Sequence, residues 1–198
     1  MAAVPRIVPH RCCGLVVDFQ DFFLAQIDKR LASRIKINTV NLLRLLGYFQ
    51  IPVVATLERP LHAKGGLPQE IADRLGDRAR VFEKEYFDLC KERAIRQHLA
   101  RLKRDQMIVA GCETDVCVLQ SCLGLVGLGY EVYAVEELLF SSAHDVDAAI
   151  ARMRAAGVAF VTYKMLFYEL LEAVEGRHTE KMTKTFGAFP DDLPDSAE

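Results

Sequence analysis

The sequence lacks the motifs of several common classes of enzyme. It contains neither a C-x-x-C nor an H-x-x-x-H pair, and its five histidines are widely scattered, so a zinc site is not expected. The first apolar run leads into DFQDFF instead of a G-x-G-x-x-G turn, which argues against a bound dinucleotide. A P-loop is also missing, as is any apolar run long enough to span a bilayer. We therefore expect no cofactor, no metal and no contact with a membrane.

An excess of charge of either sign is missing too, because 25 basic residues face 27 acidic ones. Basic side chains cluster only between residues 91 and 104, where they fit the solvated face of an amphipathic helix. Nucleic acid is therefore not expected as a partner. The first residues, MAAVPRIVPHR, lack the apolar run of a signal peptide, and the six cysteines then indicate reduced thiols in a cytoplasmic protein.

What the sequence does contain is a regular alternation of short apolar runs and longer helical patterns. The runs are too apolar to alternate between two faces, as expected when both sides of a parallel sheet are covered. Six buried strands are predicted at residues 12–17, 52–57, 79–83, 107–110, 131–135 and 158–162. Helices are predicted near residues 31–49, 68–75, 89–103, 114–128, 144–156 and 165–175, with an irregular tail after the last.

This alternation predicts an α/β fold. Right-handed crossovers give a three-layer, doubly wound, Rossmann-like sheet of six mainly parallel strands with helices on both faces. We expect a single domain over residues 1–198, in which about 187–198 form a flexible tail or an arm on a neighbouring subunit. A homo-oligomer is expected, with apolar positions such as Leu119, Leu123 and Leu125 exposed for a subunit interface.

Chemically useful side chains follow four of the predicted strands. Such sheets bind their ligands at the carboxyl ends of the strands. The residues there are Asp18 to Gln20, Glu58, Lys84, and Gly111 to Cys117. An acid, a base and a thiol thus reach one edge of the sheet from different strands, which predicts an active site for a small-molecule substrate.

Cys117 is the candidate nucleophile. Thr114 is a suitable N-cap for a helix that begins at Asp115, which puts Cys117 in the first helical turn. Free N–H groups at a helix N-terminus favour a thiolate and can also hold an oxyanion. Taken singly, each residue also has an ordinary interpretation: a buried hydrophobe for Cys117, a cap or turn residue for Asp18, and a solvated lysine for Lys84. Cys112 is expected to pack beside the site.

Three ordered motifs make the sequence resemble the isochorismatase-like cysteine hydrolases, which include nicotinamidases and N-carbamoylsarcosine amidohydrolase. The segment VAGCETDVCVLQSCLGLVGLGYEV (109–132) is similar to the G-x-x-T-x-x-C-V block of that family. DFQ (18–20) is similar to its D-x-Q element, and FEKEYFD (82–88) to its lysine-containing strand end. The resemblance covers nearly the whole chain.

The resemblance implies roles for individual residues. Cys117 would be the nucleophile, Asp18 the general acid/base and Lys84 the third member of a catalytic triad. A non-proline cis peptide is implied between Cys112 and Glu113, and the amides of Glu113 and Cys117 would form an oxyanion hole. Further candidate substrate contacts are Phe19, Gln20, Glu58 and Tyr86.

The loop LERPLHAKGGLP (57–68) differs from the Asp- and His-bearing loop of metal-binding members, and resembles the metal-free branch. Isochorismatases proper lack the cysteine nucleophile, so Cys117 favours acyl chemistry. The expected reaction is cleavage of the C–N bond of a small amide or ureido compound through a Cys117 acyl-enzyme. Two alternatives stay open: a non-catalytic binding or assembly protein that retains the fold, and an ester or thioester hydrolase with the same triad.

Overall fold

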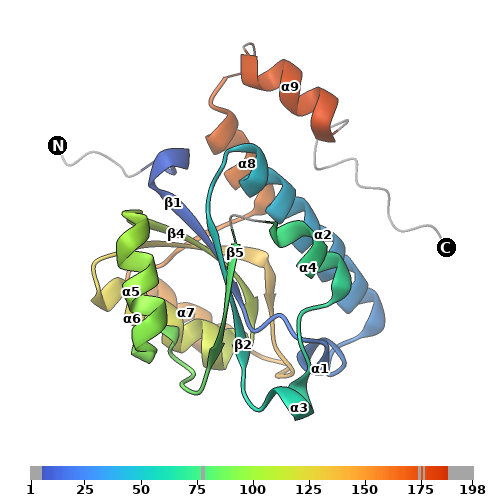
Figure 1. The fold of residues 1–198 in the computed structure, drawn as a ribbon, viewed down its shortest axis with the longest axis vertical. Coiled ribbons are helices and arrows are strands. Elements are labelled where there is room, and N and C mark those ends of the chain that lie inside the picture. The colour runs from blue at the N-terminus through green and yellow to red at the C-terminus, as the bar shows by residue number, and fades with distance from the viewer. Residues whose placement is uncertain (1–5, 77–78, 174, 176, 187–198) are drawn as a thin grey trace.

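The computed structural model describes residues 6–76, 79–173, 175 and 177–186, in which a six-stranded sheet is covered by helices on both faces (Figure 1). The strand order is β3-β2-β1-β4-β5-β6, and every neighbouring pair is parallel. The strands are β1 (Cys12–Val17), β2 (Val53–Glu58), β3 (Ala79–Lys84), β4 (Gln106–Cys112), β5 (Glu131–Phe140) and β6 (Ala159–Val161). The predicted α/β fold, with its doubly wound parallel sheet, is thereby confirmed, and each predicted strand is present.

The helices form two layers, one on each face of the sheet (Figure 1). The first layer contains α2 (Lys29–Tyr48), α4 (Gln69–Leu75) and α8 (Tyr163–Leu171), and the second α5 (Arg93–Leu102), α6 (Leu119–Gly127) and α7 (Asp147–Ala155). Two short helices, α1 (Asp21–Leu24) and α3 (Leu61–Lys64), follow the carboxyl ends of β1 and β2. Short 3-10 turns at Pro9–Arg11 and Leu89–Lys91 precede β1 and α5. Among the described residues, no helix is both long and apolar enough to cross a membrane.

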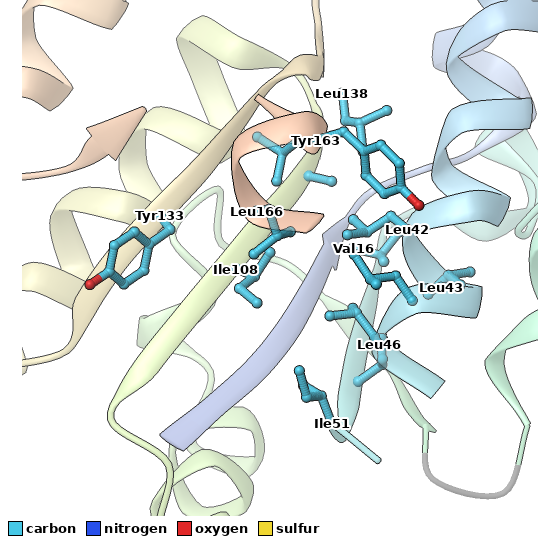
Figure 2. Close-up of a cluster of buried hydrophobic side chains, with 14 of the residues drawn as sticks. Val16, Leu42, Leu43, Leu46, Ile51, Ile108, Tyr133, Leu138, Tyr163 and Leu166 are labelled. Carbon is cyan, nitrogen blue, oxygen red and sulfur yellow. The ribbon is translucent and has the colours of Figure 1, made fainter. Parts of the chain in front are cut away.

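The core is built on the two central strands, β1 and β4, in which every residue is buried. Side chains of β1 and β4 alternate between the two helical layers, because successive residues of a strand point to opposite faces. Val16 and Ile108 therefore meet Leu42 and Leu46 of α2 and Leu166 of α8 (Figure 2). Burial on both faces fixes the register of the strands and with it the relative positions of the residues that follow them.

The structure corrects the prediction that all six strands are buried. β3 lies at the edge of the sheet, where only β2 pairs with it. Arg80, Val81 and Glu83 of this strand are exposed. The apolar residues Ala79, Val81 and Phe82 made this edge strand resemble a central strand in the sequence.

Three helix predictions also need correction. The segment 89–103 divides into the 3-10 turn and α5. Thr114 is no N-cap: a π-helical turn, Thr114–Val118, precedes α6, and Glu113 holds the cap position without a side-chain hydrogen bond. The region after residue 175 is not irregular throughout, since it forms helix α9 (Arg177–Phe186). Residues 187–198 lie outside the described part of the chain.

The α9 segment, RHTEKMTKTF, was missed because almost all of its side chains are polar. Met182 is buried, and the other described side chains of this helix are polar. Arg44 of α2 donates a hydrogen bond to the carbonyl of Thr185 at 2.8 Å, and so ties α9 to the first layer.

The expected apolar subunit interface on α6 is wrong. Leu119 and Leu125 are buried against the sheet in the second layer, and Leu123 is partly buried there. These leucines serve the core of the protein itself.

Candidate active site

The structure brings Asp18, Lys84 and Cys117 together at the carboxyl ends of the strands. Asp18 follows β1, Lys84 ends β3, and Cys117 lies in the π-helical turn after β4. All three are at least 98% buried, since their relative exposures are 0%, 1% and 2%. The rule that parallel strands end at one edge was therefore enough to predict that these residues meet.

Lys84 is the centre of this group. Its Nζ lies 2.7 Å from Oδ2 of Asp18 and 3.4 Å from Sγ of Cys117. Burial alone lowers the pKa of a lysine, but the negative charge of Asp18, the hydrogen bond to it and the negative charge of Glu58 oppose this effect, and the pKa of Lys84 is raised. Lys84 is thus held as an ammonium ion.

Asp18 has partners on both of its carboxylate oxygens. Oδ2 pairs with Lys84, and Oδ1 accepts a hydrogen bond from Oγ1 of Thr56 at 2.8 Å. Thr56 also fixes the main chain of Asp18, whose N–H donates to Thr56. Burial raises the pKa of Asp18, and the nearby Lys84 ammonium and the Thr56 hydroxyl oppose this rise. Asp18 has a φ of 48°, a left-handed conformation that Asp tolerates better than most residues.

Glu58 lies directly against the thiol, a contact that the sequence did not predict. Sγ of Cys117 donates a hydrogen bond to Oε2 of Glu58 at 2.8 Å, and Nζ of Lys84 lies 3.4 Å from the same oxygen. Glu58 was expected only as a substrate contact. The missed signal is the register of the sheet, in which Glu58 is the direct neighbour of Lys84 across the β2–β3 pair.

The other oxygen of Glu58, Oε1, accepts a short hydrogen bond from Nζ of Lys64 in α3. Burial raises the pKa of Glu58, but hydrogen bonds from Cys117 and Lys64 and the charges of both lysines outweigh it, so that the pKa is lowered. Burial and the negative charges of Asp18 and Glu58 raise the pKa of the Cys117 thiol against the opposing effect of Lys84. The resting arrangement is therefore a carboxylate on Glu58 and a protonated thiol.

Gln20 holds the end of β2 in position. Its Oε1 accepts from the main-chain N–H of Glu58 at 2.7 Å, while its Nε2 donates to the carbonyls of Glu58 (3.2 Å) and Gly65 (2.8 Å). Gln20 is fully buried, so these bonds replace water entirely. It therefore contacts the main chain that carries Glu58 and α3, and its side-chain amide is engaged there.

The turn after β4 contains a cis peptide between Cys112 and Glu113, as the family resemblance implied. Gly111, just before it, has a φ of 123°, and a Cβ at this position would lie 2.0 Å from the carbonyl oxygen of Val17. Only glycine allows β4 to run this close to the end of β1. Sγ of Cys112 donates to the carbonyl of Asp18 at 3.0 Å, in keeping with a packing role.

The remaining candidates lie farther from the thiol or face away from it. Phe19 is fully buried and makes an edge-to-face contact with Phe140, so its ring belongs to the core. Tyr86 is about half exposed (52%) and lines an open cavity of about 290 Å³. Val116, the neighbour of Cys117 in the chain, also lines this cavity. The carboxylate of Glu113 accepts hydrogen bonds from Ser142.

Asp18, Glu58 and Cys117 could together offer metal ligands, because one ligand atom of each lies within 4.8 Å of the others. The Lys84 ammonium, however, is within 3.4 Å of an atom of each of them. A cation at this point would have to displace Lys84. The arrangement thus fits an internal ammonium better than a metal ion.

Comparison with known proteins identifies the family. The isochorismatase domain model matches residues 12–165, which span every strand and the whole cluster around Cys117. The chain belongs to the isochorismatase domain family. Among its relatives, isochorismatase family protein 1B of Dictyostelium discoideum is 27% identical over 173 residues, which cover 83% of this chain and 81% of the relative.

Solved structures of this isochorismatase-like fold superimpose closely on the chain. The MAR1 ribonuclease from Caenorhabditis elegans has a TM-score of 0.83 at 23% identity, covering 98% of this chain and 100% of its own. YcaC from Escherichia coli, an octameric hydrolase of unknown specificity, has a TM-score of 0.83 at 21% identity and covers 93% and 92%. These structural neighbours differ in the activities named for them. The fold therefore does not identify the reaction of this isochorismatase-like hydrolase, which must be inferred from the residues of its site.

Proposed function

We propose that this member of the isochorismatase family is a cysteine hydrolase that cleaves the C–N bond of a small amide or ureido compound through a Cys117 acyl-enzyme. The single observation that carries the proposal is the buried cluster in which one thiol, two carboxylates and an ammonium ion lie in direct contact. Acyl transfer to a thiol needs groups that accept and donate protons and a positive charge near the developing anion. The cluster contains each of these.

The reaction proceeds in two halves. Cys117 attacks the carbonyl carbon, and the oxyanion binds to the amides of Glu113 and Cys117 beside the cis peptide. Asp18, as general acid/base beside Lys84, accepts the proton of the thiol as the sulfur attacks and passes it to the departing amine. Water then hydrolyses the thioester, and Asp18 accepts a proton from this water and returns it to the sulfur as the C–S bond breaks.

The substrate is small because the site is closed. Cys117 is only 2% exposed, and Asp18, Lys84 and Glu58 around it are buried as well. An amide is favoured over an ester because an amine departs poorly without a proton, and a site that supplies one is suited to this leaving group. Glu58 borders the thiol, and Lys64 of α3 binds the other oxygen of Glu58; both add polar groups for a ureido or amide substrate to meet.

The test is a screen of small amides, ureas and esters with the wild-type protein and Cys117→Ala. We expect release of ammonia or an amine from at least one amide or urea by the wild type only, and an acyl adduct on Cys117 in mass spectra of quenched reactions. Activity retained in Cys117→Ala would overturn the assignment. Hydrolysis of esters without any amide would assign the protein to the alternative ester hydrolases.

We also propose that the protein is cytoplasmic and that it forms a homo-oligomer. The oligomer is supported by Tyr86 and Phe87, two aromatic residues that follow β3 beside the site and are about half exposed (52% and 54%). Light scattering on the purified protein tests the oligomeric state, and a monomeric mass would contradict it.

A further inference from the structure

We propose that Ser141 and Ser142 are positioning residues for the reaction, because they hold the turn whose amides bind the oxyanion. This inference rests on the proposed function and deepens it. The turn follows β4 and carries Glu113 and Cys117, whose main-chain N–H groups the proposed mechanism uses for the oxyanion. The two serines follow β5, the strand that pairs with the end of β4.

Both serines contact the turn directly. Oγ of Ser141 donates a hydrogen bond to Oδ1 of Asp115 at 2.6 Å. Ser142 binds Oε1 of Glu113 twice, through its main-chain N–H at 3.1 Å and through its hydroxyl. Hydrogen bonds to a carboxylate are stronger than those between neutral groups. Two consecutive serines thus hold two residues of the same short turn.

Glu113 is also bonded to the rest of the turn. Its carbonyl accepts hydrogen bonds from the amides of Val116 and Val118, at 3.1 and 3.0 Å, on either side of Cys117. A shift of Glu113 therefore moves its own amide and disturbs the part of the turn that carries Cys117. Oxyanion binding is sensitive to such a shift, because its donors must lie at hydrogen-bond distance from the developing charge.

The path of β5 brings the serines to this turn. The register between β4 and β5 shifts between Val109 and Gly111, where β5 carries extra residues. After this bulge the strand continues to Phe140, opposite Cys112, and the two serines follow it directly. Bulges are frequent beside active sites, where they re-aim the side chains that follow. The bulge therefore places the serines beside the turn that begins after Cys112.

Ser142 also controls the charge of the Glu113 side chain. A carboxylate close to the oxyanion would repel it, because a buried site screens charges poorly. Ser142 is exposed, and its two hydrogen bonds keep the carboxylate of Glu113 at the surface, outside the cluster around Cys117. The residue that offers its amide to the oxyanion is thereby kept from opposing it with its side chain.

The test compares two reactions of the Cys117 thiol in the full chain, each followed by peptide mass spectrometry. Iodoacetamide alkylates the sulfur without forming an oxyanion, whereas p-nitrophenyl acetate acetylates it through a tetrahedral oxyanion. Both reactions need access to the thiol and its ionisation, so these factors cancel in the ratio of the two rates. The ratio therefore reports on the amides that bind the oxyanion.

Ser142→Ala is expected to lower the ratio of acetylation to alkylation about tenfold, since complete removal of an oxyanion donor costs about a hundredfold or more. Ser141→Ala should lower the ratio less, because this serine holds Asp115 and not Glu113. Ser142→Thr keeps the hydroxyl and should restore the wild-type ratio. A merely structural loss would change both rates together and leave the ratio unchanged.

The matched control is Ser33→Ala, which changes an exposed serine of α2 and should reproduce the wild-type ratio. Amide hydrogen exchange gives an independent measurement. In Ser142→Ala, exchange should accelerate in the peptide that contains residues 112–118 and stay unchanged in α2.

Failure of the inference and failure of the proposed function give different results. If p-nitrophenyl acetate does not acetylate Cys117 of the wild type, the proposed function is overturned, and hydrogen exchange still decides whether the serines hold the turn. If the wild type is acetylated, an unchanged ratio in both Ser141→Ala and Ser142→Ala would overturn the inference, as would unchanged exchange in the turn.

Discussion

Lys84 and Asp18 form an ion pair that is completely buried, with Nζ 2.7 Å from Oδ2 and both side chains 0% exposed. Each charge replaces the water that the other has lost, and neither is tolerated at this depth without its partner. The pair joins the ends of β3 and β1, with β2 between them. It therefore contributes to the fold as well as to the proposed chemistry, and the two contributions can be measured separately.

Lys84→Met should lower the free energy of unfolding by about 3–5 kcal/mol, because it leaves the Asp18 carboxylate buried without compensation. Urea denaturation measures the loss. Adding Asp18→Asn should recover part of it, since the uncompensated charge is then removed. The matched control is Lys36→Met, which breaks a largely solvated pair with Glu70 and should cost at most about 1 kcal/mol. Equal losses in the two lysine variants would contradict the argument.

Gly111→Ala should destabilise the protein by about 2–4 kcal/mol, since the new Cβ would meet the carbonyl of Val17 at 2.0 Å and the φ of 123° strains any side chain. Gly127→Ala, in the last turn of α6 with open space around it, should be neutral or stabilising by up to about 1 kcal/mol. Thermal unfolding of the two variants distinguishes them. The reverse order of melting temperatures would show that the close approach of β4 to β1 is not essential.

Gln20→Ala should cost about 2–4 kcal/mol, because it leaves the buried N–H and carbonyl of Glu58 without their side-chain partner. Hydrogen exchange should accelerate first at Glu58 and in α3, where Gln20 is bound. Gln26→Ala removes a hydrogen bond between an exposed side chain and the carbonyl of Phe22, and should change stability by less than about 0.5 kcal/mol. Exchange that is unchanged around Glu58 would argue against this anchoring role.

The pH dependence of stability should carry a contribution from Glu58. Its pKa is lowered in the folded protein, so the unfolded chain takes up the proton more readily below its ordinary value of 4.5. The stabilisation is complete above that value and is lost as the pH falls through the folded pKa. Glu58→Gln should therefore unfold with a shallower dependence on pH than the wild type between about pH 3 and about pH 5.

Asp18 should act with the opposite sign. Because its folded pKa is raised, the unfolded chain releases the proton first as the pH rises above the ordinary value of 3.8, and stability decreases there. Urea denaturation at several pH values measures both contributions. The control for Glu58→Gln is Glu136→Gln, which changes an exposed glutamate that pairs with Arg154. If both variants showed the same dependence of stability on pH, the contribution assigned to Glu58 would be contradicted.

The central part of the fold could be predicted because its strands are apolar on both faces. The runs 12–17 and 107–110 have this composition, and they became β1 and most of β4. The meeting of Asp18, Lys84 and Cys117 followed from topology alone. The edge position of β3 could not be predicted in this way, because strand order depends on contacts between distant segments.

The contact of Glu58 with the thiol of Cys117 could not be predicted from the sequence, for a similar reason. Its position after the second strand placed it near the site, but the contact with the thiol depends on the register between β2 and β3 and on the path of the turn that carries Cys117. Helix α9 was missed because its sequence, RHTEKMTKTF, has too few apolar residues to give a periodic signal. Features that depend on local composition, such as the central strands, were predicted. Features that depend on the pairing of distant segments, such as the strand order and the contact of Glu58, were not.

The edge position of β3 has a consequence for how the protein fails on heating. Lys84 stands at the end of a strand that, among the described strands, pairs with β2 alone, through six residue pairs. An edge strand can open locally while the remaining sheet stays intact. Because such an opening would withdraw the ammonium ion from Asp18 and Cys117, we expect function to be lost on heating before the domain as a whole melts.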